Sequence, residues 1–130
     1  MSDIYQDFIL EIYQNPLNFG KLSDPEFQAN SHNPLCGDKI TLELRTKDGK
    51  IEEIKYHGSG CAISQVSASL LTETVKGKTV AEAKAMKKDD MLKLLKVDLS
   101  KNPSRLKCAL LALEVLHKAL GEKTGKQTGL

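Results

Sequence analysis

Three cysteines carry most of the chemical potential of this sequence: Cys36, Cys61 and Cys108. An odd number of cysteines argues against a disulfide framework, and the first residues lack the basic and apolar regions of a signal peptide. The three are also too far apart in sequence for the C-x-x-C pairs of a zinc finger. This pattern favours free thiols that bind a metal or take part in catalysis, in a cytoplasmic protein.

The residues around each cysteine predict that it lies where a loop meets a helix or a strand. Cys36 lies between a proline and a glycine, just before a predicted strand. Cys61 follows the glycine-rich residues 58–60 and directly precedes a predicted helix, and Cys108 lies beside Lys107 in the opening turns of the last helix. A helix N-terminus presents unpaired N–H groups and a partial positive charge, which favour a thiolate.

Asp38 can supply a fourth donor beside these thiols, because it stands two residues after Cys36. If the three loops meet at one end of a sheet, three thiolates and one carboxylate make a complete tetrahedral set for a metal. The alternative is that each cysteine is buried and acts as a small hydrophobic side chain, a common role for free cysteine.

The clearest strand signal is a hairpin over residues 39–57. Apolar residues alternate on both sides of Asp48-Gly49, a pair typical of a type I′ turn, in which both central residues have positive φ. Ile51 and Ile54 are out of phase with a two-residue period, which indicates either a bulge or a frayed start of the strand. Weaker alternation predicts a short strand over 26–32.

Helical spacing of apolar residues predicts the other elements. The first helix covers 3–15, with Ser2 as its N-cap, and ends before Pro16. The predicted helices after the hairpin run from Ala62 to a C-cap at Gly77, over 79–87, over 89–96, and from Asn102-Pro103 to Gly121. This order predicts an α+β fold with a three-stranded antiparallel sheet covered on one face by helices. Residues 1–120 are expected to form a single domain and 121–130 a flexible polar tail.

Composition narrows the classes of partner. The 130 residues include 19 Lys and Arg against 17 Asp and Glu, a formal net charge of +2. Nucleic-acid and anionic-membrane binding usually need a clustered basic excess, so neither partner is expected. The apolar runs are also far shorter than the roughly 20 residues that cross a bilayer.

Three segments resemble the cysteine motifs of the U-type iron–sulfur cluster assembly proteins, the IscU, SufU and NifU N-terminal group. They are NPLCGD (33–38), GSGCAISQVSAS (58–69) and LKCALLALEVL (106–116), in the family's order and with similar separations. The resemblance covers nearly the whole chain, from Tyr13 to the last helix. It implies an IscU/SufU-like fold.

The resemblance also implies a function, a site and partners. The chain would be a scaffold on which a transient [2Fe–2S] cluster is built and from which it is transferred. The ligands would be Cys36, Asp38, Cys61 and Cys108. Sulfur would come from a pyridoxal-phosphate cysteine desulfurase, and apo-iron–sulfur proteins or carriers would receive the cluster. A homodimer around a cluster is one expected arrangement.

Two departures from the IscU branch leave a second function open. Lys107 stands where that branch has histidine, and its LPPVK-type segment is missing; both changes resemble the SufU branch. The SufU branch usually carries an insertion between the second and third motifs, and this chain is too short there to contain it. The alternative is therefore a zinc-containing sulfur acceptor, a sulfurtransferase, so enzyme status stays open and Zn²⁺ could occupy the same site.

The two functions differ in the cysteine expected to receive sulfur first. By resemblance, the persulfide acceptor would be Cys36 in a sulfurtransferase and Cys108 in a scaffold. A third possibility is an adaptor in which a zinc ion has only a structural role. His57 is a further candidate for an occasional ligand, although a partly buried strand histidine is the simpler interpretation.

Overall fold

The structure is a computed structural model that describes residues 2–33, 37–96 and 102–121, with side chains described from residue 7 onward. Its elements, in chain order, are α1 (Ser2–Gln14), β1 (Phe27–Asn33), β2 (Asp38–Lys47), β3 (Lys50–Ser59), α2 (Ala62–Val75), α3 (Val80–Lys84), α4 (Lys88–Leu95) and α5 (Pro103–Gly121). The predicted tail lies almost entirely outside the described residues.

The three strands form one antiparallel sheet in the order β1-β2-β3, which confirms the predicted sheet. Asp48 and Gly49 have φ of 55° and 78°, as the type I′ turn requires. The register of β2 and β3 shifts between Arg45 and Thr46, whose partners are Glu53 and Ile51. This irregularity is the predicted bulge, and it brings Ile51 back to the buried face.

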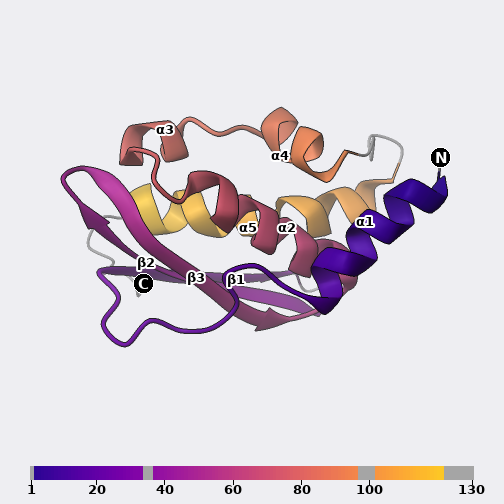
Figure 1. Cartoon of the computed structure of the whole chain (residues 1–130), viewed down its shortest axis with the longest axis horizontal. Helices are drawn as coiled ribbons and strands as arrows, with labels where there is room; N and C mark the ends of the chain where they lie inside the picture. Colours follow the sequence, from indigo (N-terminus) through magenta and orange to yellow (C-terminus); the bar gives the residue numbers. More distant parts are fainter. Residues whose placement is uncertain (1, 34–36, 97–101, 122–130) are drawn as a thin grey trace.

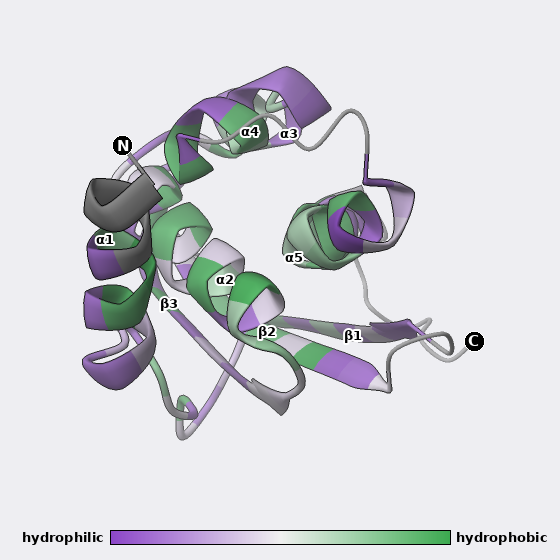
Figure 2. Ribbon diagram, turned by 90° about the vertical axis from the view of Figure 1, so that its right-hand side faces the viewer, coloured by the Kyte–Doolittle hydropathy of each residue, from purple (hydrophilic) through white to green (hydrophobic). Residues whose placement is uncertain are grey.

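Helices α2 and α5 pack on one face of the sheet, and α3 and α4 lie outside them (Figures 1 and 2). Apolar residues from these layers form the core. Its fully buried members include Ile40, Leu42, Leu44 and Ile51 from the sheet, Leu71 and Val75 from α2, Met91 from α4, and Ala112 and Leu116 from α5. Burying one side chain of this size stabilises the fold by about 1.5–3 kcal/mol.

The connector between α1 and β1 crosses the outer edge of β3. Asn18 and Gly20 form backbone hydrogen bonds to Tyr56, from Tyr56 N to Asn18 O (3.0 Å) and from Gly20 N to Tyr56 O (2.7 Å). The connector then reaches the sheet face opposite the helices, where Leu22 N donates to the buried Glu43 carboxylate at 2.7 Å. Part of this second face is therefore also covered.

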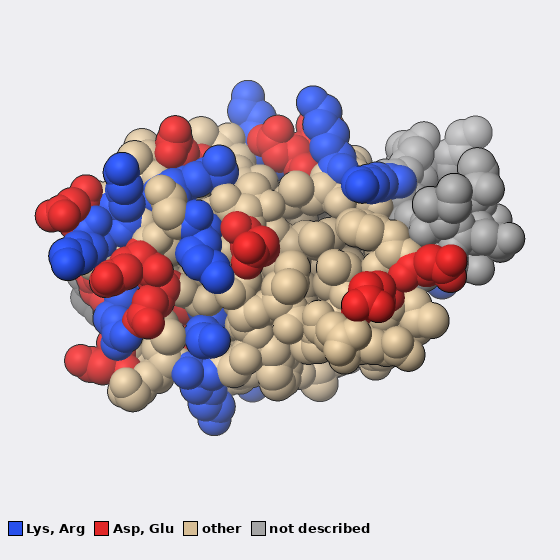
Figure 3. Space-filling view, in the orientation of Figure 1, with Lys and Arg blue, Asp and Glu red and all other residues tan. Residues whose placement is uncertain are grey.

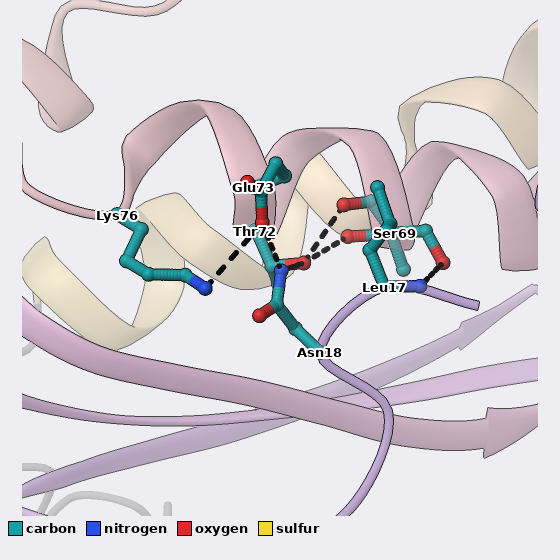
Figure 4. Close-up of polar contacts among 7 residues, drawn as sticks. Leu17, Asn18, Ser69, Thr72, Glu73 and Lys76 are labelled. Carbon is teal, nitrogen blue, oxygen red and sulfur yellow. Dashed lines mark hydrogen bonds and ion pairs between the residues drawn. The ribbon is translucent and has the colours of Figure 1, made fainter.

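Asn18 ties this connector to α2, as Figure 4 shows. Its side-chain nitrogen donates to Thr72 Oγ1 and to Glu73 Oε1, each at 3.1 Å. The bond from Asn18, helped by Lys76, lowers the pKa of Glu73 below its usual range. Asn18 has a φ of 61°, a left-handed conformation that asparagine adopts more readily than most residues.

Helix ends follow the local signals, with three corrections. The Asn102 side chain accepts Arg105 N at 3.2 Å, as predicted for an N-cap. The C-cap of α2 is Lys76 and not the predicted Gly77, which follows it with a φ of 87° and whose N–H donates to Ile51 O in the sheet. The helix predicted over 79–87 ends at Lys84, because Lys87 is extended and caps α4.

The third correction concerns Ser2, which was predicted to cap α1 and instead lies within it, since α1 already begins there. In the described part of the chain, none of the helices is both long and apolar enough to cross a membrane. The face drawn in Figure 3 carries charged side chains of both signs around the hairpin turn and is mostly uncharged at its centre.

Candidate metal centre

Cys61 lies at the N-cap of α2, where β3 turns into the helix. Its backbone is extended, with φ −74° and ψ 167°, and its side chain is exposed. Gly60 before it has a φ of +143°, and a Cβ there would overlap the Asp38 carboxylate. Glycine is therefore required at 60 both for its backbone conformation and for its close approach to Asp38.

Asp38 begins β2 and is completely buried. One carboxylate oxygen accepts the backbone N–H of Cys61 at 2.9 Å, and the other lies 3.7 Å from the Cys61 sulfur. A carboxylate beside the N-terminus of α2 also interacts favourably with the helix dipole. Asp38 thus fixes the backbone at Cys61 and offers an oxygen beside its sulfur.

Cys108 lies in the second turn of α5 and is only 3% exposed. Because α5 begins at Pro103, Cys108 is too far into the helix for the unpaired N–H groups expected around it from the sequence. Its sulfur instead lies 4.0 Å from the side-chain nitrogen of Asn33, which is also buried. Of these two cysteines, only Cys61 therefore lies at the N-terminus of a helix.

These three residues form one cluster although they come from separate elements. A carboxylate oxygen of Asp38 and the sulfurs of Cys61 and Cys108 all lie within 4.8 Å of one another. The cluster sits at the end of the sheet where Asn33 pairs with Asp38 and Lys39 pairs with Ser59. Cys36, the remaining predicted ligand, lies outside the described residues.

The donor set suits a metal ion or an iron–sulfur cluster. Thiolate sulfur is the preferred ligand of iron–sulfur clusters and, together with carboxylate oxygen, is a common ligand of zinc. The described residues supply three candidate donors, two of them soft sulfurs and one a hard oxygen. Such a set can bind a metal, and its oxygen is the weaker partner for a sulfide-bound iron.

Two further residues, Ser64 and Asn33, lie close to the sulfurs of the cluster. Ser64 is buried, and its hydroxyl oxygen lies 3.9 Å from the Cys61 sulfur. The hydroxyl donates to Cys61 O at 3.1 Å, and this hydrogen bond stabilises the first turn of α2. Asn33 was not singled out from the sequence. The signal that could have identified it is its place at the end of a strand beside a cysteine loop.

His57 is not part of the described cluster. His57 Nε2 lies 3.3 Å from Glu43 Oε2 on the sheet face opposite the helices. Burial tends to raise the pKa of Glu43, but hydrogen bonds from Leu22 N–H, His57 and Gln28 outweigh it and leave the pKa below its usual range. His57 is therefore a partly buried strand residue, as the simpler interpretation expected, and its partner is Glu43.

Lys107 is exposed next to the buried Cys108. It lines a groove of about 310 Å³ between β1 and α5, together with His32, Asn33 and Glu114. Asn33 thus lines this groove and also approaches the Cys108 sulfur.

The fold and this cluster together define a small α+β protein with a thiol-rich candidate metal centre at one end of its sheet. Residues 4–129 match the family described as the NifU-like N terminal domain, and the chain belongs to that family. The resemblance to the U-type assembly proteins is confirmed.

The chain is similar over almost its whole length to relatives named as a sulfurtransferase and to relatives named as scaffold proteins. The zinc-dependent sulfurtransferase SufU of Bacillus subtilis is 34% identical over an alignment of 140 residues, gaps included, which covers 96% of this chain and 95% of that protein. The iron–sulfur cluster assembly scaffold protein IscU 1 of Archaeoglobus fulgidus is 36% identical over 126 residues, 95% of this chain and 80% of the relative.

Solved structures agree with the fold. The crystal structure of an iron–sulfur cluster assembly scaffold protein for the SUF system from Fervidobacterium islandicum superposes with a TM-score of 0.78 at 28% identity, covering 88% of this chain and 94% of that one. The N-terminal part of a NifU-like protein from Brucella abortus gives a TM-score of 0.81 at 26% identity, covering 95% of this chain and 96% of that one.

Proposed function

We propose that this protein is a scaffold for the assembly and transfer of a [2Fe–2S] cluster, with sulfur supplied by a cysteine desulfurase. The observation that carries the proposal is the convergence of Asp38, Cys61 and Cys108 within 4.8 Å. Support also comes from relatives that are named as iron–sulfur assembly scaffolds. The cluster is cargo, so apo-iron–sulfur proteins or carriers are the partners that receive it.

The ligands in this proposal are Cys36, Asp38, Cys61 and Cys108, of which Cys36 rests on the family resemblance. A hard carboxylate oxygen is a poor match for iron bound to sulfide. Asp38 would therefore be the first ligand to dissociate, and its departure would open a position for a thiolate of the receiving protein. The three cysteines would hold the cluster until that exchange.

Sulfur delivery requires a thiolate that the donor can reach. The thiolate attacks the outer sulfur of a persulfide on the desulfurase, a new S–S bond forms, and the donor cysteine leaves as a thiolate. Conversion of the transferred sulfur to sulfide then takes two electrons from an external reductant. Cys61 is exposed and Cys108 is 3% exposed, so the described conformation disfavours Cys108 as first acceptor.

The second candidate function is a zinc-dependent sulfurtransferase. It is favoured by the 34% identity to a relative with that name. Asp38 and the cysteines would hold the zinc, which would keep the thiolates unreactive until a desulfurase docks. Cys36 would then be the acceptor. Both functions depend on free thiols, which persist in a reducing compartment such as the cytoplasm.

Two measurements test these functions. Anaerobic reconstitution with iron, cysteine and desulfurase, followed by visible absorption and metal analysis, tests the scaffold, and about two irons per bound cluster are expected. Mass spectrometry of the persulfide after incubation with desulfurase and cysteine, without iron, identifies the acceptor. A persulfide on Cys36 in a protein that retains one zinc and forms no cluster would favour the sulfurtransferase.

A further inference from the structure

Asn33 is the last residue of β1 and is 6% exposed, so its amide group lies inside the protein. Its side-chain nitrogen lies 4.0 Å from the Cys108 sulfur, within the range of an N–H···S hydrogen bond. Two backbone features fix its position. Asn33 pairs with Asp38 in the sheet register, and its carbonyl accepts Gly37 N at 2.8 Å.

The two described sulfurs therefore have different surroundings. The Cys61 sulfur is exposed and lies 3.7 Å from a carboxylate oxygen and 3.9 Å from the Ser64 hydroxyl. The Cys108 sulfur is buried and has an amide donor beside it. A donor stabilises negative charge on a sulfur in a site that solvent hardly reaches, whereas a nearby carboxylate does not.

We propose that Asn33 is a positioning residue of the candidate metal centre, whose amide N–H donates to the Cys108 sulfur when that sulfur binds metal. The proposal rests on the proposed function, because it assumes that Cys108 is a ligand. Asn33 holds the sulfur in one orientation and draws electron density from it. Groups that hydrogen-bond to metal ligands set their orientation and tune the bound metal.

This role has a direct electronic consequence. A hydrogen bond lowers the energy of the sulfur lone pairs and so raises the energy of sulfur-to-metal charge transfer. Hydrogen bonds to sulfur also help to set the reduction potential of iron–sulfur clusters. An amide that merely satisfied its own hydrogen-bonding needs in the core would affect neither property.

Cobalt(II) binding to the metal-free protein tests the proposal, because thiolate-to-cobalt charge transfer can be observed directly. Asn33→Leu removes the donor at similar volume, and Asn33→Asp keeps the shape but replaces the donor with an acceptor. Asn30→Leu is the matched control, since Asn30 is an exposed residue of the same strand. Thermal unfolding of each metal-free variant shows whether it is folded.

For Asn33→Leu we expect the charge-transfer band at longer wavelength and a Co²⁺ affinity lower by about ten-fold, the smaller end of the range for such partners. Asn33→Asp should shift the band in the same direction, because it also lacks the donor, and Asn30→Leu should match the wild type. An unchanged band and affinity in a folded Asn33 variant would overturn the proposal. A wild-type protein without any charge-transfer band would instead refute the metal centre itself.

Discussion

The Asp38 carboxylate binds Cys61 in two ways at once: one oxygen accepts the Cys61 backbone N–H at 2.9 Å and the other lies 3.7 Å from the Cys61 sulfur. Asp38 opens β2 and Cys61 caps α2, so this contact joins the sheet to the helix at the candidate metal centre. The same carboxylate is a structural group and a candidate ligand, and variants must separate these roles.

Replacing Asp38 tests its part in cluster release. Asp38→Cys exchanges a hard oxygen for a soft thiolate, so the cluster should be held more tightly and its transfer to an apo-ferredoxin should slow by about ten-fold, equivalent to about 1.4 kcal/mol in the barrier. Asp38→Ala should also change the transfer rate. The measurement is the appearance of holo-ferredoxin with time, and wild-type rates in both variants would contradict the role of Asp38.

Gly60→Ala tests the close approach between β3 and Asp38. The added Cβ would overlap the carboxylate, and the φ of +143° is unfavourable for alanine. Backbone strain of this kind costs about 1–3 kcal/mol, and displacement of Asp38 should add to that cost and weaken metal binding. Gly77→Ala is the control, because Gly77 has a φ of +87° with nothing within 4 Å of its Cβ position. Equal losses of unfolding free energy and unchanged metal affinity in both variants would show that the overlap has no effect.

Asn18 offers a test of how the connector is held on α2. Asn18→Gly keeps the left-handed backbone but loses two side-chain hydrogen bonds, to Thr72 and Glu73, at about 1 kcal/mol each. Asn18→Ala loses the same bonds and adds about 1–2 kcal/mol of strain at a φ of 61°. Denaturant titration should therefore give the highest unfolding free energy for the wild type, a lower one for Asn18→Gly and the lowest for Asn18→Ala. An alanine variant as stable as the glycine variant would contradict the strain argument.

Glu43 should make folding stability depend on acid pH. Its pKa in the folded state is lowered from its usual value of 4.5, so its charged form stabilises the fold above that pH. This contribution disappears as pH falls through the lower folded pKa. The stability advantage of wild type over Glu43→Gln should therefore be largest near neutral pH and shrink below about pH 4.5. Glu52→Gln, at an exposed position of the neighbouring strand, is the control for loss of one carboxylate. A difference that is independent of pH would contradict the assigned hydrogen bonds.

The features that sequence predicted well are those set by neighbours in the chain. The hairpin turn follows from Asp48-Gly49, whose positive φ values are a local property, and the start of α5 follows from Asn102-Pro103. The bulge near Ile51 was detectable because the apolar period fails there.

The features that sequence missed depend on contacts between distant residues. The pairing of Asn33 with Asp38 and its approach to Cys108 need the sheet register and the packing of α5. No local pattern reports that Cys108 is buried while Cys61 is exposed, so the chemical difference between the two sulfurs had to come from the structure.

Metal and sulfide analysis after anaerobic reconstitution with iron, cysteine and a desulfurase is the most direct test of the proposed function. The scaffold account predicts sulfide-to-iron charge-transfer bands and about two irons per bound cluster, both lost when Cys61 and Cys108 are replaced by serine. A protein that retains one zinc ion, gains no colour and binds no iron would contradict it.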